Sequence, residues 1–186
     1  RTFCGQAFPV SWVTVRKGAS ITADSPSTWT QVRDFLVPGV SSGQGRVYVA
    51  GTGEIVTDAA LAGGLSITYL AQHLQFEGVV LGGAVRDHDM VRRSGIPVVA
   101  SNFIPVDTQG AFRVQSYGAS CIINNVTVTS GDWVISDGNG TVLVPPSAIA
   151  EALRRAATIE ETEDAILKRI AAGEALPSII DEVGRI

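Results

Sequence analysis

The sequence predicts an α/β fold with a partly parallel sheet, an antiparallel β-layer and a long C-terminal helix. Apolar strand-like and helix-like segments alternate between Arg46 and Ser101, which favours parallel strands joined by helices. Short β-branched segments follow at regular spacing from Phe112, which favours antiparallel pairing. A helical pattern then fills about residues 147–172. Because 186 residues suffice for one sizeable core, we expect a single domain over residues 1–186.

The first part of the chain is expected to hold a strand, a loop and a short helix. Residues Ala7 to Val15 alternate in polarity and are rich in β-branched side chains, as in a strand. Residues 17–28 are polar and contain Pro26, which indicates a loop. The segment "TWTQVRDFLV", residues 28–37, predicts a short helix after the loop.

The middle of the chain carries a β-α-β-α-β pattern. The segment "RVYVAG" predicts a strand, and apolar residues at helical spacing predict a helix that begins near Gly64 or Leu65. The segment "GVVLGG" lacks polar alternation, as in a strand buried on both faces. The segment "DMVRRSG" predicts a helical turn closed by Gly95, and "IPVVAS" predicts the next strand. In such units, ligands bind beyond the carboxyl ends of the strands.

The last part of the chain changes character. The segments "FRVQSYG", "CIINNVTVT", "DWVISD" and "TVLVPP" predict short strands, the last two joined by a hairpin turn at residues 138–140. After two prolines, Ser147 is expected to cap a long helix that ends at Gly173.

Composition narrows the class of protein. The net charge is −4 and the chain has no run of lysine or arginine, which argues against nucleic-acid binding. No segment has the apolar length of a membrane helix and no signal peptide is visible, so we expect a cytoplasmic protein that binds no membrane. Cys4 and Cys121 are expected to be unpaired thiols.

The motif "GGAVRDHDM" contains the most informative side chains. Consecutive strand residues point to opposite faces, so Arg86 and Asp87 can serve one site only if the strand has already turned there. Arginine matches a carboxylate with two hydrogen bonds, and aspartate can hold a hard divalent cation. Together the pair could bind an anionic, metal-chelating small molecule. The alternative is a surface ion pair in a βα loop.

The segment "AGGLS", residues 62–66, places two glycines at a helix start just before that strand. Free amides at a helix start bind anions without a charged side chain. A carboxylate could lie between these amides and Arg86. The alternative is an ordinary glycine-assisted turn into a helix.

These motifs, with the strand "PVVAS" and the hairpin "GDWVISDGNGTVLVP", resemble the RraA-like family. The family includes metal-dependent 4-hydroxy-4-methyl-2-oxoglutarate/4-carboxy-4-hydroxy-2-oxoadipate aldolases and regulators of ribonuclease E. The resemblance runs from Phe3 to about Gly173 and implies an α/β/β fold similar to phosphohistidine swivelling domains. It also implies a homotrimer or a dimer of trimers with sites between subunits. The family's N-terminal helical segment is expected to be missing, since the sequence as given begins at Arg1.

The resemblance also implies a site and a reaction. Arg86 and Asp87 correspond to the pair that binds pyruvate and Mg²⁺ or Mn²⁺, with Asp87 as the metal ligand and both residues catalytic. The backbone amides that take the substrate's carboxylate correspond to four consecutive residues: Gly64, Leu65, Ser66 and Ile67. The implied function is that of a lyase on 2-oxo acids, which performs retro-aldol cleavage or oxaloacetate-type decarboxylation through a metal-bound pyruvate enolate.

One position departs from the aldolase pattern. The aldolases have an acidic residue where this chain has Leu65, so a carboxylate that could move protons is missing. Two further readings therefore stay open: a related lyase with altered chemistry, and a non-catalytic binding protein similar to the ribonuclease E regulators. A family acid in the C-terminal helix of a neighbouring subunit corresponds loosely to Glu161 or Glu163. A phosphohistidine carrier is not supported, because no histidine lies in a glycine-rich loop.

Overall fold

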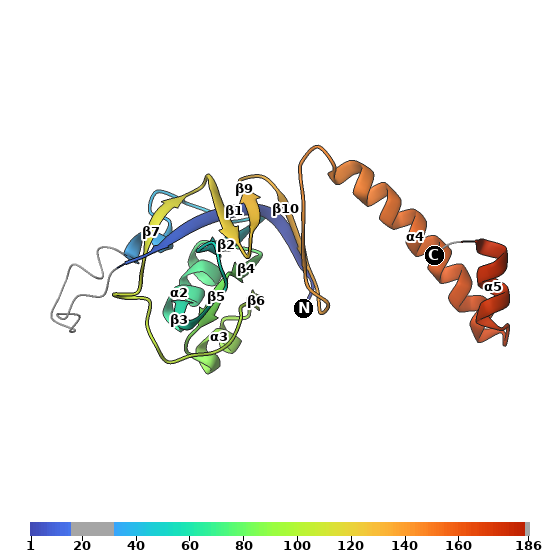
Figure 1. Ribbon diagram of the computed structural model, residues 1–186, viewed down its shortest axis with the longest axis horizontal. Coiled ribbons are helices and arrows are strands. Elements are labelled where there is room, and N and C mark those ends of the chain that lie inside the picture. Colours follow the sequence, from blue (N-terminus) through green and yellow to red (C-terminus); the bar gives the residue numbers. More distant parts are fainter. Residues whose placement is uncertain (16–31, 185–186) are drawn as a thin grey trace. The chain divides into compact units, whose positions relative to one another are not determined.

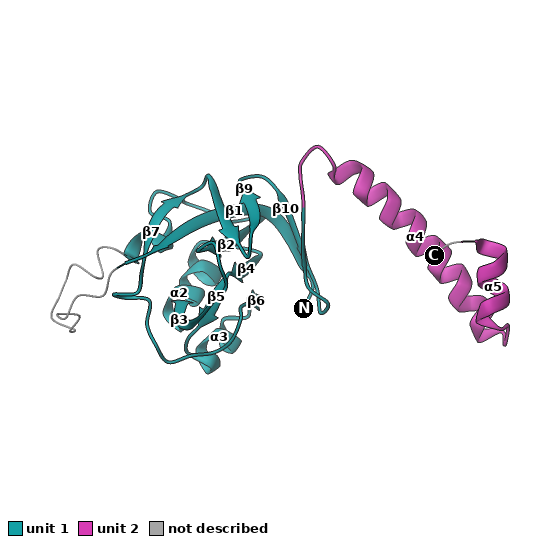
Figure 2. Ribbon diagram, in the orientation of Figure 1, with its two compact units in different colours: residues 1–143 teal, residues 144–186 magenta. Residues whose placement is uncertain are grey.

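The computed structural model describes residues 1–15 and 32–184. These form two compact units, residues 1–143 and 144–186, which are described separately (Figure 2). The single domain expected over residues 1–186 stays a prediction. The expected loop at residues 17–28 lies outside the described residues, as does the start of the helix expected at residues 28–37. The rest of that segment contains a 3₁₀ helix, η1, at Arg33–Leu36.

Unit 1 is built around a seven-stranded sheet (Figure 1). The strand order is β11-β10-β1-β2-β4-β6, and β7 also pairs with β1. The bounds are β1 Phe3–Thr14, β2 Arg46–Gly51, β4 Gly78–Leu81, β6 Val98–Val99, β7 Phe112–Tyr117, β10 Trp133–Ser136 and β11 Thr141–Val144. The β1–β2, β2–β4 and β4–β6 pairs are parallel, whereas β7 and β10 run antiparallel to β1. The sheet is therefore partly parallel, as predicted.

The predicted β-α-β-α-β pattern is confirmed. Helix α2, Gly64–Thr68, continues as a π-helical turn, η2, Tyr69–His73, and α3 spans His88–Ser94. Gly95 ends α3 in the left-handed conformation that was expected of a closing glycine. Strand β6 is shorter than predicted, because the chain beyond Val99 leaves β4: the amide of Ser101 donates to the carbonyl of Gly83.

Two strands were not predicted. Strands β3, Val56–Ala62, and β5, Gly83–Val85, form a separate two-stranded parallel sheet. The segment "VTDAALA" of β3 gives a weak strand signal, because alanine and aspartate are depleted in strands. The apolar run "GVVLGGAV" divides at Gly82 into β4 and β5.

Side chains on the two faces of the large sheet enter two different cores. One core combines alternate residues of β1, β2 and β4 with Ile67, Leu70 and Val91 from the helices. The other combines the intervening strand residues with Cys121 and Val128 from a β-hairpin. Helices thus pack on one face and a β-layer on the other, which is the expected α/β/β arrangement.

The hairpin on the second face consists of β8, Ser120–Ile123, and β9, Val126–Thr129, paired antiparallel. Asn124 and Asn125 form its turn with positive φ, which asparagine tolerates. The sequence predicted "CIINNVTVT" as one strand because this turn contains no glycine or proline. The turn predicted at residues 138–140 is present, since the amide of Asp137 donates to the carbonyl of Gly140 at 3.0 Å.

Unit 2 contains the long helix α4, Ile149–Ala171, and a second helix, α5, Leu176–Val183, that was not predicted. The expectation that Ser147 caps α4 is wrong. Ala148 is the N-cap, because the amide of Ala148 donates to the carbonyl of Pro145 and Ser147 lies inside that turn. Gly173, with φ of 91°, follows the end of α4 as expected. Among the described residues, no helix is long and apolar enough to cross a membrane.

Candidate functional site

The parallel pairing of β3 and β5 brings the two predicted motifs together. Ala62, the last residue of β3, pairs with Val85, the last residue of β5. The amide of Arg86 donates to the carbonyl of Ala62 at 2.9 Å. The glycines after β3 and the Arg86–Asp87 pair after β5 therefore leave the same sheet edge side by side, where parallel strands place their ligands.

Asp87 turns the chain immediately after the strand. Its φ of 63° and ψ of 55° are left-handed, and it is the N-cap of α3. Asp87 Oδ2 accepts a hydrogen bond from the amide of Gly64 at 2.9 Å. Because β5 ends at Val85, the side chains of Arg86 and Asp87 line the same cavity, as the sequence required for a shared site.

The two glycines are needed for this close approach. A Cβ atom on Gly63 would lie 2.9 Å from Asp87 Oδ2, and one on Gly64 would lie 2.4 Å from Met90 Cβ. Contacts this short are not tolerated by real side chains. A larger residue at Gly64 would push α3, and Asp87 with it, away from α2, whereas a larger residue at Gly63 would displace the Asp87 carboxylate.

Arg86 is held by a carboxylate that the sequence did not single out. Its Nη1 lies 3.4 Å from Asp107 Oδ2, and the two side chains are 34% and 40% exposed. Gln109 Nε2 donates to the same carboxylate oxygen at 3.5 Å. Asp107 lies in an irregular segment whose pattern gives no functional signal, which is why it was missed.

The cavity has a volume of about 350 Å³ and combines a charged end with an apolar wall. The charged side chains that line it are Arg86, Asp87 and Asp107. The apolar wall comes from β1, the segment around η1, β3, α2 and η2: Trp12, Val32, Phe35, Leu36, Leu61, Ala62, Leu65 and Tyr69. Cavities of this size and mixed lining are typical small-molecule sites.

The four residues predicted to donate backbone amides to the substrate do not all face the cavity. Leu65 and Ser66 line the cavity, and their amides make no hydrogen bond among the described residues. The amide of Gly64 is used by Asp87. Ile67 is fully buried and its amide donates to the carbonyl of Gly63 at 2.9 Å, so the structure does not bring Ile67 to the cavity.

The donor set is compatible with one hard divalent cation. Asp87 Oδ1 makes no hydrogen bond among the described residues, and Oδ2 accepts one from Gly64. The described residues contain no group of three His, Cys, Asp or Glu side chains that could form a metal cage. Mg²⁺ commonly binds through one or two carboxylates while water and substrate oxygens complete its shell. A single ligand such as Asp87 suits that mode.

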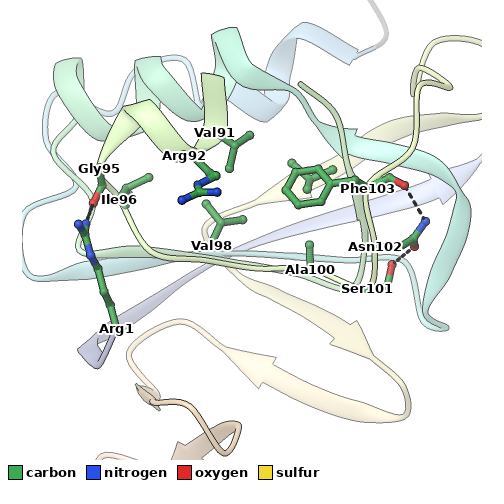
Figure 3. A pocket seen from close by; sticks show the side chains of 11 residues that line it. Arg1, Val91, Arg92, Gly95, Ile96, Val98, Ala100, Ser101, Asn102 and Phe103 are labelled. Atoms are coloured by element: carbon green, nitrogen blue, oxygen red, sulfur yellow. Dashed lines mark hydrogen bonds between the residues drawn. The ribbon is translucent and has the colours of Figure 1, made fainter. Parts of the chain in front are cut away.

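A second, larger cavity of about 580 Å³ lies between α3 and β6 (Figure 3). Val91 and Arg92 of α3, Val98 of β6 and Phe103 contribute to its lining. No aspartate or glutamate is among the described residues that line it, and it contains none of the predicted site residues. The smaller cavity is therefore the candidate site.

Two histidines and an aspartate of the β10–β11 turn are not among the described residues that line this cavity. His88 Nδ1 is 3.0 Å from Asp89 Oδ1, and this contact lowers the pKa of the Asp89 carboxyl. The ring of His73 stacks on Tyr69. Asp137 accepts hydrogen bonds from two amides of the β10–β11 turn, which lower the pKa of its carboxyl.

The remaining candidates are the thiols and the helix acids. Cys4 and Cys121 are unpaired, as expected, and burial raises the pKa of Cys121 to about 12. Glu161 and Glu163 are exposed on α4.

Comparisons with known proteins agree with this architecture. A sequence model of the family described as RraA-like, Aldolase/RraA, matches residues 1–143. An uncharacterized protein of Methanocaldococcus jannaschii is 30% identical over 78% of this chain and 70% of its own. A Pseudomonas fluorescens protein, named provisionally as a 4-hydroxy-4-methyl-2-oxoglutarate aldolase, is 29% identical over 55% of this chain and 61% of its own.

Protein DlpA of Legionella pneumophila is 31% identical over 59% of this chain, but the match spans only 18% of DlpA. Among solved structures, RraAS2 of Streptomyces coelicolor, described as an unusual member of the RNase ES inhibitor RraA protein family, is 23% identical. It superposes with a TM-score of 0.70 over 91% of this chain and 79% of its own. That similarity confirms the fold.

Proposed function

Because the chain belongs to the RraA-like family, we propose that it is a divalent-metal-dependent lyase that releases pyruvate from 2-oxo acids by retro-aldol cleavage or decarboxylation. One observation carries the proposal. Arg86, Asp87 and the amide-bearing residues Leu65 and Ser66 line one cavity of small-molecule size. A guanidinium, a carboxylate and unused amides are what a 2-oxo acid and a hard cation require.

Arg86 binds and orients the substrate's carboxylate. Asp107 holds the guanidinium from one side at 3.4 Å and leaves other N–H groups of the fork for the ligand. A planar fork that matches both carboxylate oxygens fixes the plane of the 2-oxo acid. The amides of Leu65 and Ser66 can add neutral donors to the same carboxylate, as helix starts do.

Asp87 is the residue that would hold Mg²⁺ or Mn²⁺. Its hydrogen bond from Gly64 fixes one carboxylate oxygen, and the other accepts no hydrogen bond from the part of the chain that the structure describes. When bound, such a cation supplies Lewis-acid polarisation of the keto oxygen. Asp87 is also the N-cap of α3, so the helix fixes the position of the carboxylate that would bind the metal.

We further propose that the chain works as a homotrimer or a dimer of trimers with the site between subunits. This part rests on the resemblance to the family. Glu161 or Glu163 of a neighbouring copy is the proposed source of an additional acid, and both side chains are exposed. Light scattering on the purified protein should give three or six times the 19.5 kDa chain mass.

A second candidate function is that of a non-catalytic binding protein. The observation that favours it is Leu65, which lines the cavity with a side chain that is 78% exposed and carries no carboxylate. An exposed leucine suits contact with a protein partner better than proton transfer.

Pyruvate release from oxaloacetate tests the proposed function. We expect purified protein with Mg²⁺ or Mn²⁺ to release pyruvate faster than the free metal ion alone, and EDTA to abolish the difference. Asp87→Asn should reduce the rate roughly a hundredfold or more, because it removes the ligand charge. The matched control is Asp89→Asn, which removes an exposed carboxylate two residues away. If folded and assembled protein releases pyruvate no faster than the free metal ion, the result favours the non-catalytic binding function.

A further inference from the structure

Within residues 1–15 and 32–184, the side chains that line the cavity carry little positive charge. Arg86 is the one Arg, Lys or His among the described residues that line it, whereas Asp87 and Asp107 are both acidic. These three side chains sum to one negative charge, and a bound divalent cation would make the sum one positive charge. That total neutralises one carboxylate of a ligand. A second carboxylate would enter the cavity without a partner, which is costly.

Three polar side chains of the lining already have hydrogen-bond partners. Ser66 Oγ donates to the carbonyl of Gly63 and accepts from the Gly63 amide. Thr108 Oγ1 donates to the carbonyl of Ala60. Gln109 Nε2 contacts Asp107. The donors that remain among the described residues include Trp12 Nε1 and the amides of Leu65 and Ser66. These donors are neutral, so they add no positive charge for a second carboxylate.

The rest of the cavity is apolar and extends from buried to exposed side chains. Trp12, Phe35 and Leu61 are buried, whereas Leu65 and Tyr69 are 78% and 37% exposed. Burying apolar ligand surface against such a wall favours binding, because it removes that surface from water. A ligand anchored by its carboxylate at Arg86 places its remaining atoms against this wall.

We propose that the substrate is a 4-hydroxy-2-oxo acid whose C4 carries an uncharged aliphatic or aromatic group instead of a second carboxylate. This inference rests on the proposed function, since it assumes that Arg86 and Asp87 hold the 2-oxo acid end. Leu65 is then part of the wall that recognises the apolar group. Its place in the wall gives a physical reason for a leucine at a position where the aldolases have an acid.

The reaction balances without an oxidant or reductant. The C4 hydroxyl loses its proton and becomes the carbonyl of an aldehyde as the C3–C4 bond breaks. The electron pair of that bond goes to C3, which then takes up a proton. A phenyl-substituted substrate, 4-hydroxy-2-oxo-4-phenylbutanoate, gives pyruvate and benzaldehyde. Its acidic counterpart, 4-hydroxy-2-oxoglutarate, gives pyruvate and glyoxylate.

The test compares kcat/KM for these two substrates in the wild-type protein and in two variants of Leu65. We expect the wild type to prefer the phenyl substrate at least tenfold. Leu65→Arg adds a cation to the exposed part of the wall and should shift the ratio at least tenfold toward 4-hydroxy-2-oxoglutarate. Leu65→Gln is the matched control, because it makes the position polar without charge, and it should shift the ratio much less. Intrinsic differences in substrate reactivity cancel between variants.

Oxaloacetate turnover in the same preparations distinguishes failure of the proposed substrate specificity from failure of the proposed lyase function. If oxaloacetate is decarboxylated but the dicarboxylate is cleaved as well as or better than the phenyl substrate, the apolar specificity is wrong and the lyase function stands. Equal shifts in Leu65→Arg and Leu65→Gln would also overturn the specificity. If neither oxaloacetate nor any aldol is turned over, the proposed function fails, and this inference fails with it.

Discussion

Asp87 has a left-handed backbone, and this one residue lets two adjacent side chains serve the same cavity. In an extended strand, Arg86 and Asp87 would point to opposite faces. Asparagine and aspartate tolerate this conformation better than other non-glycine residues. The hydrogen bond from Gly64 to Asp87 Oδ2 then fixes the carboxylate against the start of α2.

Leu65 occupies the position where the aldolases have an acid, so a substitution there tests the role of that acid in proton transfer. Leu65→Glu restores a carboxylate beside the proposed carboxylate-binding amides, so it should accelerate steps that need proton transfer. We expect the Mg²⁺-dependent exchange of pyruvate methyl protons with D₂O to rise at least ~10-fold, at the low end of general acid–base effects. Oxaloacetate decarboxylation should change less, because its bond cleavage needs no base. The 78% exposure of Leu65 makes a loss of stability small.

Leu65→Gln is the control for this experiment, since its side chain is polar and cannot take up a proton. Exchange measured by ¹H NMR should stay at the wild-type rate in Leu65→Gln. An equal rise in both variants would mean that polarity alone is responsible. No rise in Leu65→Glu would contradict the view that the missing acid limits proton transfer.

Residue identity predicted some of the site and could not predict the rest. Arg86 and Asp87 stood out because charge is rare beside a buried strand, and the glycines marked a helix start. Asp107 could not be found, because its position beside Arg86 depends on the path of an irregular segment. Ile67 was predicted as one of four amide donors to the substrate; in the structure the first turn of α2 uses its amide and its side chain lies in the core.

At the scale of elements, the site depends on the close contact between α2 and α3. Gly64→Ala would place a Cβ 2.4 Å from Met90 Cβ and 3.0 Å from Asp87 Cβ. Because these atoms are close to the backbone and cannot rotate away, α3 must shift. We expect a loss of about 1–3 kcal/mol in the free energy of unfolding, typical of overpacking. Oxaloacetate turnover should fall with it.

Gly138→Ala is the matched control for this substitution. Its added Cβ would have no heavy atom within 4 Å, so stability and turnover should both stay close to wild type. Urea denaturation of the two variants measures the difference directly. A Gly64→Ala protein with wild-type stability and full turnover would show that the α2–α3 contact does not position Asp87.

The order of elements was more predictable than their pairing. The β-α-β-α-β pattern could be recognised because buried parallel strands such as β4 are continuous apolar runs. Strand β3 was not predicted, because its alanines are buried by packing against residues that are distant in the sequence. The local sequence pattern does not show those contacts. Yet β3 is the element that brings the glycines beside Arg86. The geometry of the site therefore had to come from the fold.

For the whole molecule, the family match and the first compact unit cover the same residues, 1–143. All the side chains assigned to the cation and the 2-oxo acid belong to this unit. Unit 2 is held together by its own contacts: Arg169 pairs with Glu174 and Glu182, which joins α4 to α5. Only the exposed glutamates of α4 enter the proposal from this unit, as groups offered to another copy.

The central claim is that Arg86, Asp87 and one divalent cation form a single binding site for a pyruvate enolate. Oxalate tests it most directly, because it mimics the planar enolate and its binding requires no proton transfer. The absence of an acid at position 65 therefore does not affect the outcome. Isothermal calorimetry should detect oxalate binding only when Mg²⁺ is present. We expect Asp89→Asn to bind like the wild type, and Asp87→Asn and Arg86→Lys to lose binding. Oxalate binding that is unchanged in Asp87→Asn, or that is equally strong without Mg²⁺, would contradict the claim.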